Sequence, residues 1–189
     1  MKAFVLRAFC AVVLLFALYS LALGAFDEGP AFQRAFSYGY LVAVPFTLQP
    51  MIVILAGAML GSRLGAASMM GYLALGVIGL PVFAASPLLP QGAARLLGPT
   101  GGYLMAYPIA AFVTGVLVER GFSRRFMTAL VAMLAGVGVI YAGGLTWLAG
   151  AHVTSFSLAV AAGAAPFLIA DLCKAVLAAA IVAKLPYRM

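Results

Sequence analysis

Long apolar stretches separated by short polar connections dominate the chain. Six stretches can be marked, from Ala8 to Ala25, Leu41 to Leu60, Leu64 to Phe83, Pro99 to Val118, Phe126 to Gly150, and Phe156 to Ala183. About 20 apolar residues in an α-helix cross a hydrocarbon core of roughly 30 Å, so each stretch is long enough to span a bilayer. The pattern predicts an all-α integral membrane protein, a compact bundle of six transmembrane helices that forms a single domain over residues 1–189.

The connections between these stretches carry most of the charge, and its distribution predicts an orientation. If the spans alternate, one side holds Lys2, Arg7, Arg63, Arg120, Arg124, Arg125, Lys184 and Arg188, and the other holds only Arg34 and Arg95. Loops rich in Lys and Arg stay on the cytoplasmic side of a membrane. We therefore expect the N- and C-termini in the cytoplasm.

The composition agrees with a membrane protein and excludes several functions. Hydrophobic residues make up 66% of the chain and charged residues 8%, and the mean hydropathy is +1.18. The net charge of +7 comes from basic residues scattered between apolar runs, which does not favour nucleic-acid binding. Cys10 and Cys173 both lie within apolar segments, which predicts buried thiols and no metal site. The chain contains no Gly-x-x-x-x-Gly-Lys-[Ser/Thr] motif, so it cannot hydrolyse ATP itself.

Two charged residues near the middle of the last stretch are the strongest candidates for a binding site. Asp171 and Lys174 are three residues apart and share one helix face. A charge at the centre of a span costs roughly 2.5 to 3.5 kcal/mol on insertion scales, and such residues usually face the protein interior and serve a ligand or ion path. A purely structural ion pair is the alternative.

Further candidates lie on the predicted outer side. Thr47 and Gln49 stand beside Pro45 and Pro50, where prolines leave backbone carbonyls available, although a local bond to that backbone explains either residue alone. The connection from Ala84 to Gly98 carries Arg95 and is expected either to fold back over a cavity or to form a plain external loop.

Aromatic and small residues allow two interpretations each. The walls of a site would be formed by Tyr72, Phe83, Tyr103 and Tyr107, while tyrosines in membrane proteins are more often interfacial anchors. The repeat Gly57, Gly61 and Gly65 fits either a contact with another subunit or tight local packing at a turn. His152, the single histidine, is interpreted as a surface loop residue.

Four segments together resemble a known family. They are Val44-Pro45-Phe46-Thr47-Leu48-Gln49 with the following run from Leu55 to Gly65, Gly76 to Phe83, Leu97 to Leu104, and Pro166-Phe167 with Asp171-x-x-Lys174. In order and spacing they are similar to the BioY family, the biotin-specific S components of energy-coupling-factor (ECF) transporters. The first stretch departs from the family, because its alanines form no Ala-x-x-x-Ala, the pattern associated with docking to the coupling protein.

The resemblance implies a protein of the bacterial cytoplasmic membrane that captures biotin from outside, without catalysis or a cofactor. It implies as partners a transmembrane coupling protein and two ABC-type ATPases, besides membrane lipid. Arg95 is expected to bind the valerate carboxylate of biotin, and the fused-ring head is expected near Asp171, Lys174, Thr47 and Gln49, with Tyr72 and Tyr103 beside it. Two alternatives are a solitary, gradient-driven biotin carrier and an intramembrane hydrolase that uses Asp171 or His152.

Overall fold

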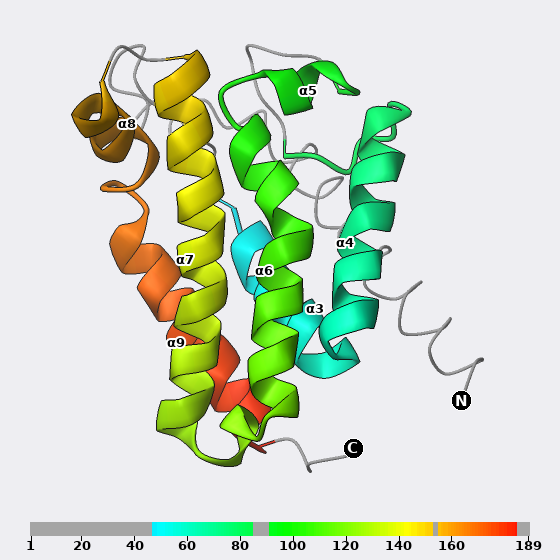
Figure 1. The fold of residues 1–189 in the computed structure, drawn as a ribbon, viewed down its shortest axis with the longest axis vertical. Coiled ribbons are helices and arrows are strands. Elements are labelled where there is room, and N and C mark those ends of the chain that lie inside the picture. The colour runs from blue at the N-terminus through cyan, green and yellow to red at the C-terminus, as the bar shows by residue number, and fades with distance from the viewer. Residues whose placement is uncertain (1–46, 85–90, 153–154, 185–189) are drawn as a thin grey trace, which may run out of the picture.

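The structure, a computed structural model, describes residues 47–84, 91–152 and 155–184, and all regular elements in these ranges are helical (Figure 1). They are α3 (Gln49–Leu60), α4 (Ser62–Val77), α5 (Ala94–Leu97), α6 (Gly101–Glu119), the 3-10 helix η1 (Phe122–Arg124), α7 (Phe126–Ala151), α8 (Phe156–Gly163) and α9 (Leu168–Lys184). Helices α6 and α7 form the most extensive contact of the bundle, with α3 and α4 packed on α6 and with α8 and α9 packed on α7.

Two of these helices, α6 and α7, are long and apolar enough to cross a membrane unbroken. Helices α8 and α9 are long enough to cross a membrane only when they are taken together, and the chain bends by 59° between them. The 12 residues of α3 and 16 of α4 span about 18 and 24 Å at 1.5 Å per residue, less than a full crossing. The described residues are all-helical and include helices apolar enough for a membrane, as predicted. The count of six spans stays a prediction, since the stretch from Ala8 to Ala25 and both termini lie outside the described residues.

Helix α4 ends at Val77, six residues before the end of the predicted stretch. Gly79 follows with a φ of +98°, a conformation that favours glycine, and Pro81 lacks the N–H that a helix would need. Hydropathy does not indicate where a helix is interrupted, so the continuous apolar run did not predict this break. As a result, Phe83 and Ala84 leave the helix and reach the interior of the bundle.

The last predicted stretch is likewise divided, by a break between Gly163 and Leu168 that contains Pro166. Asp171 therefore lies in the first turn of α9 and not in the middle of a straight span. The buried face of α9 is Asp171, Lys174, Ala175, Ala178, Ala179 and Val182, a helical spacing. Cys173 lies on the opposite, exposed face, so the prediction of a buried thiol is wrong for it. Cys10 lies outside the described residues.

The glycine repeat serves packing inside this chain. A side chain on Gly57 would collide with the backbone of Ala111 on α6, and one on Gly65 would meet the backbone of Gly57. Gly61 forms the turn between α3 and α4 with a φ of +83°. Of the two interpretations of the repeat, tight local packing at a turn is the one that the structure supports.

Candidate functional site

A cavity lies within the bundle between α3, α6, α7 and α9, and α5 contributes to its wall. Its free volume is about 60 Å³, several times the space that one water molecule requires. Its apolar wall is formed by Phe83, Tyr103, Leu104, Tyr107, Ile140 and Phe167. Its polar side chains are those of Thr47, Gln49, Arg95, Thr100, Tyr141, Asp171 and Lys174. An apolar cavity with a few convergent polar groups is typical of a small-molecule site.

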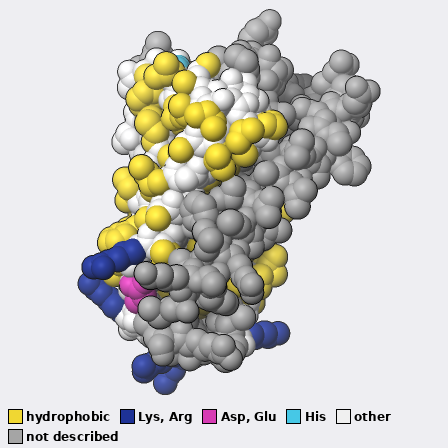
Figure 2. Space-filling model, turned by 90° about the vertical axis from the view of Figure 1, so that its right-hand side faces the viewer, with side chains coloured by type: hydrophobic (Ala, Val, Ile, Leu, Met, Phe, Trp, Pro, Cys, Tyr) yellow, Lys and Arg dark blue, Asp and Glu magenta, His cyan; other side chains and the backbone are white. Residues whose placement is uncertain are grey.

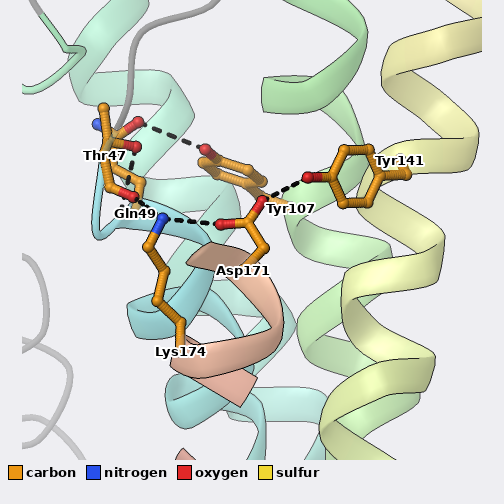
Figure 3. A network of polar contacts seen from close by, with 6 residues as sticks. All are labelled: Thr47, Gln49, Tyr107, Tyr141, Asp171 and Lys174. Carbon is orange, nitrogen blue, oxygen red and sulfur yellow. Dashed lines mark hydrogen bonds and ion pairs between the residues drawn. The ribbon is translucent and has the colours of Figure 1, made fainter. Parts of the chain in front are cut away.

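An ion pair between two buried residues of α9 forms one part of the cavity wall (Figure 3). Lys174 Nζ donates to Asp171 Oδ1 over 2.7 Å, and the predicted pairing is confirmed. The same ammonium donates to the backbone carbonyl of Thr47 over 2.6 Å. Thr47 therefore holds Lys174 through its main chain, whereas its hydroxyl accepts from the backbone N–H of Gln49 over 3.4 Å. This ties the segment before α3 to α9.

Tyr141 completes the surroundings of Asp171. Its hydroxyl donates to Asp171 Oδ2 over 2.6 Å, so each carboxylate oxygen accepts one protein hydrogen bond (Figure 3). A carboxylate has about four acceptor positions, and two therefore remain for a ligand. The sequence interpretation missed Tyr141, whose only signal was a hydroxyl inside a long apolar stretch.

Gln49 is held by a network of phenols and backbone. Its Nε2 donates to Tyr72 Oη over 2.9 Å and, over a long 3.5 Å, to the carbonyl of Val82, while Tyr107 Oη donates to Gln49 Oε1 over 3.3 Å. Because the Val82 carbonyl can only accept a hydrogen bond, the NH₂ group of Gln49 must face Val82, and its Oε1 must face Tyr107. Gln49 thus offers an acceptor oxygen to the cavity. Tyr72, predicted as a ligand contact, is fully buried behind Gln49 and does not line the cavity.

Arg95 on α5 lines another part of the cavity and is only 3% exposed. Within residues 47–84, 91–152 and 155–184 no carboxylate pairs with it, and its Nε has no hydrogen-bond partner. Burial lowers the pKa of this guanidinium, and the proximity of Tyr72 raises it, but an arginine remains charged at neutral pH. A buried cation is costly unless an anion compensates it, and no carboxylate of the described residues does so here. The described part of the connection from Ala84 to Gly98 therefore belongs to the cavity wall.

Tyr103 also lines the cavity, as predicted, and its hydroxyl donates to the carbonyl of Gly163 over 2.9 Å. This bond fixes the end of α8 against α6, directly before the break that leads to Asp171. His152 is exposed at the end of α7, away from these residues, which leaves it without a catalytic partner in the described cavity. In the part of the chain that the structure describes, no three His, Cys, Asp or Glu residues group as a metal site.

Comparisons with known proteins identify the family of this chain. The family model described as the BioY family matches residues 6–189. A probable biotin transporter BioY from Pyrococcus horikoshii is 44% identical over 75% of this chain and 80% of its own length. The biotin transporter BioY from Rhodobacter capsulatus is 40% identical over 86% of this chain and 84% of its own length.

A solved structure is similar over nearly the whole chain. It is the crystal structure of the S component for biotin from an ECF-type ABC transporter, with a TM-score of 0.79 at 25% sequence identity. The match covers 97% of this chain and 90% of the other. Sequence, fold and cavity thus lead to one assignment: the chain belongs to the BioY family of membrane transport proteins.

Proposed function

We propose that this chain captures biotin and takes part in its uptake as the substrate-binding subunit of an ECF-type importer. The observation that carries the proposal is a cavity that combines Arg95, which pairs with no carboxylate among the described residues, with the carboxylate of Asp171 and the amide oxygen of Gln49. Relatives named biotin transporters and the biotin S component support the same ligand.

The chemistry of biotin fits the groups of this cavity. Its ureido ring offers two N–H donors and one carbonyl acceptor. Asp171 and the Gln49 oxygen supply acceptors for the two donors, and the apolar wall with Phe83 and Tyr107 suits the fused rings. Lys174 places a positive charge beside the Asp171 carboxylate and holds it in position through a hydrogen bond.

Arg95 is the partner that we assign to the valerate carboxylate. A guanidinium matches a carboxylate with two parallel hydrogen bonds, and the ligand would supply the counter-ion that this buried cation lacks among the described residues. The carboxylate of biotin would thereby compensate the charge of Arg95 at one part of the cavity, and its ureido N–H groups would donate to Asp171 and Gln49 at another. A ligand without a carboxylate would leave Arg95 uncompensated.

Transport requires energy from outside this chain. We place it in the bacterial cytoplasmic membrane as a multi-pass protein that works with a transmembrane coupling protein and two ABC-type ATPases. The arginines around η1 would face the cytoplasm and Arg95 the outer side, in agreement with the positive-inside rule. A solitary, gradient-driven carrier would use the same cavity. Uptake measured with and without the ATPase module separates the two.

Equilibrium binding of tritiated biotin to the purified full chain in detergent tests the proposal. We expect saturable binding that excess unlabelled biotin displaces. Arg95→Lys isolates the geometry of this contact, because lysine keeps the positive charge but cannot form the two parallel hydrogen bonds. This variant should bind biotin more weakly than the parent. Absence of binding at micromolar biotin, in a protein that remains helical and monodisperse, would overturn the assignment.

A further inference from the structure

Arg95 lies on a helix that is too short to hold its own position. Helix α5 has four residues, about one turn, and no side chain caps its N-terminus. An isolated helix needs roughly 12 to 15 residues to be even marginally stable in water. The place of Arg95 in the cavity wall therefore depends on contacts that α5 and its flanking residues make with the rest of the bundle.

Two side-chain hydrogen bonds hold the segment that contains α5, one at each end. Before α5, Gln91 Nε2 donates to the backbone carbonyl of Phe83 over 3.1 Å. After α5, Trp147 Nε1 on α7 donates to the carbonyl of Gly98 over 2.9 Å. Gly98 is the C-cap residue of α5. The bond from Trp147 thus joins the end of α5 to a residue that lies 49 positions later in the sequence.

Two glycines at the start of α6 make room for this arrangement. A side chain on Gly101 would collide with the backbone of Leu96 in α5, and one on Gly102 would collide with the side chain of Trp147. Neither glycine lines the cavity. The Gly-Gly pair of the segment from Leu97 to Leu104 therefore serves to place α5 and the indole ring closely against the first turn of α6.

Helix α5 lies across the end of the bundle at which α6 begins (Figure 1). Figure 2, which is turned about the vertical axis, shows the visible Lys and Arg side chains at the opposite, lower end. In the proposed orientation the end with α5 faces outward, the side from which the ligand arrives. A hydrogen bond that fixes α5 there acts where the carboxylate of the ligand would be recognised.

We infer that Trp147 is a positioning residue for Arg95 and thereby sets the preference of the cavity for a ligand with a carboxylate. The inference rests on the proposed function, in which Arg95 binds the valerate carboxylate. Two parallel hydrogen bonds require the guanidinium and carboxylate planes to be aligned, so a small displacement of α5 weakens this contact. Asp171 and Gln49 lie on α9 and α3, whereas α5 packs on α4 and α6, so the same displacement leaves the ureido contacts in place.

Equilibrium binding of biotin and of biotinamide, its uncharged analogue, to the purified full-length Trp147→Phe variant tests this inference. Phenylalanine keeps an aromatic ring but has no N–H. The Gly98 carbonyl still accepts from the backbone N–H of Gly101 over 2.9 Å, so the variant leaves this acceptor with a partner and should fold. We expect biotin to bind about fivefold more weakly, which corresponds to about 1 kcal/mol for one neutral hydrogen bond, and biotinamide to stay within about twofold of the parent.

Two further variants separate positioning from a general effect on the fold. In an Arg95→Ala background, Trp147→Phe should have no additional effect on either ligand, because the guanidinium through which it acts is absent. The matched control, Thr146→Val, removes a hydrogen-bond donor from the same turn of α7. The Thr146 hydroxyl donates to the carbonyl of Ala142 within the helix over 2.7 Å, so this variant should bind both ligands like the parent.

Three outcomes would overturn the inference alone. Unchanged biotin binding by Trp147→Phe would show that the bond to Gly98 does not position Arg95. Equal losses of biotin and biotinamide would attribute the effect to a general disturbance of the fold. A loss of biotin affinity that persists in the Arg95→Ala background would show that Trp147 acts through another residue. A parent chain that binds neither ligand would instead refute the proposed function, and this inference with it.

Discussion

Replacing Asp171 by asparagine tests the central contact of the proposed site with the smallest change of shape. Both carboxylate oxygens now accept protein hydrogen bonds, one from Lys174 and one from Tyr141. Asparagine keeps one acceptor oxygen and replaces the other by an NH₂ group. If that oxygen stays with Lys174, the NH₂ group faces Tyr141, whose hydroxyl can turn to accept. The network therefore survives, but the ligand loses a charged acceptor.

The size of the loss follows from the difference between charged and neutral hydrogen bonds. A hydrogen bond to a charged group contributes about 1.5 to 3 kcal/mol, against about 0.5 to 1.5 kcal/mol between neutral partners. The midpoints of these ranges differ by about 1.3 kcal/mol, so the loss of the charge at Asp171 should weaken the affinity for biotin by close to tenfold. The ammonium of Lys174 also loses its counter-ion, which acts in the same direction.

Equilibrium binding of tritiated biotin to purified Asp171→Asn measures this effect. Cys173→Ser is the matched control, because it changes one atom on the exposed face of the same helical turn and should bind biotin like the parent. Thermal unfolding of both variants separates binding from folding. If well-folded Asp171→Asn bound biotin as tightly as the parent, the placement of the ureido ring beside Asp171 would have to be abandoned.

Three other predictions follow from the same geometry. Lys174→Ala should lower both biotin affinity and thermal stability, because it removes the ion-pair partner of a buried carboxylate at a cost of about 3 to 5 kcal/mol. The double variant with Asp171→Asn should lose less binding free energy than the sum of the two single variants, because both changes remove the same pair. Additive losses would show that the two residues do not act as a pair. Arg95→Ala should weaken biotin more than biotinamide, its uncharged analogue, and equal losses would refute the carboxylate contact. In a chain whose native cysteines are changed to serine, an impermeant thiol reagent added to intact cells should label His152→Cys and not Arg124→Cys; the reverse would overturn the proposed orientation.

The ion pair of α9 shows how far sequence reasoning reached. Two charges three residues apart in an apolar stretch are too costly to face lipid, so their shared helix face had to turn inward and their pairing was predictable. The structure places them 2.7 Å apart. What the spacing could not provide was the partner from α7, since nothing local indicates that Tyr141 reaches Asp171.

The apolar stretches were identified from hydropathy, but their internal breaks were not. Gly79, Pro81 and Pro166 were visible in the sequence, yet each sat within a run that reads as one continuous span. Whether such a residue ends a helix depends on what satisfies the freed backbone groups, and in a bundle these partners come from neighbouring helices. Both breaks border the cavity, with Phe83 after one and Phe167 before α9 at the other.

By itself the sequence determined that this chain is a helical membrane protein and that its intramembrane charges face inward, because solvation in a bilayer constrains every residue locally. The resemblance of its motifs added the family. Only the tertiary structure decided that Thr47 contributes a backbone carbonyl, that Tyr72 orients Gln49 from behind the cavity, and that Tyr141 reaches Asp171. Such contacts join residues far apart in sequence, and they exist only once the helices have packed.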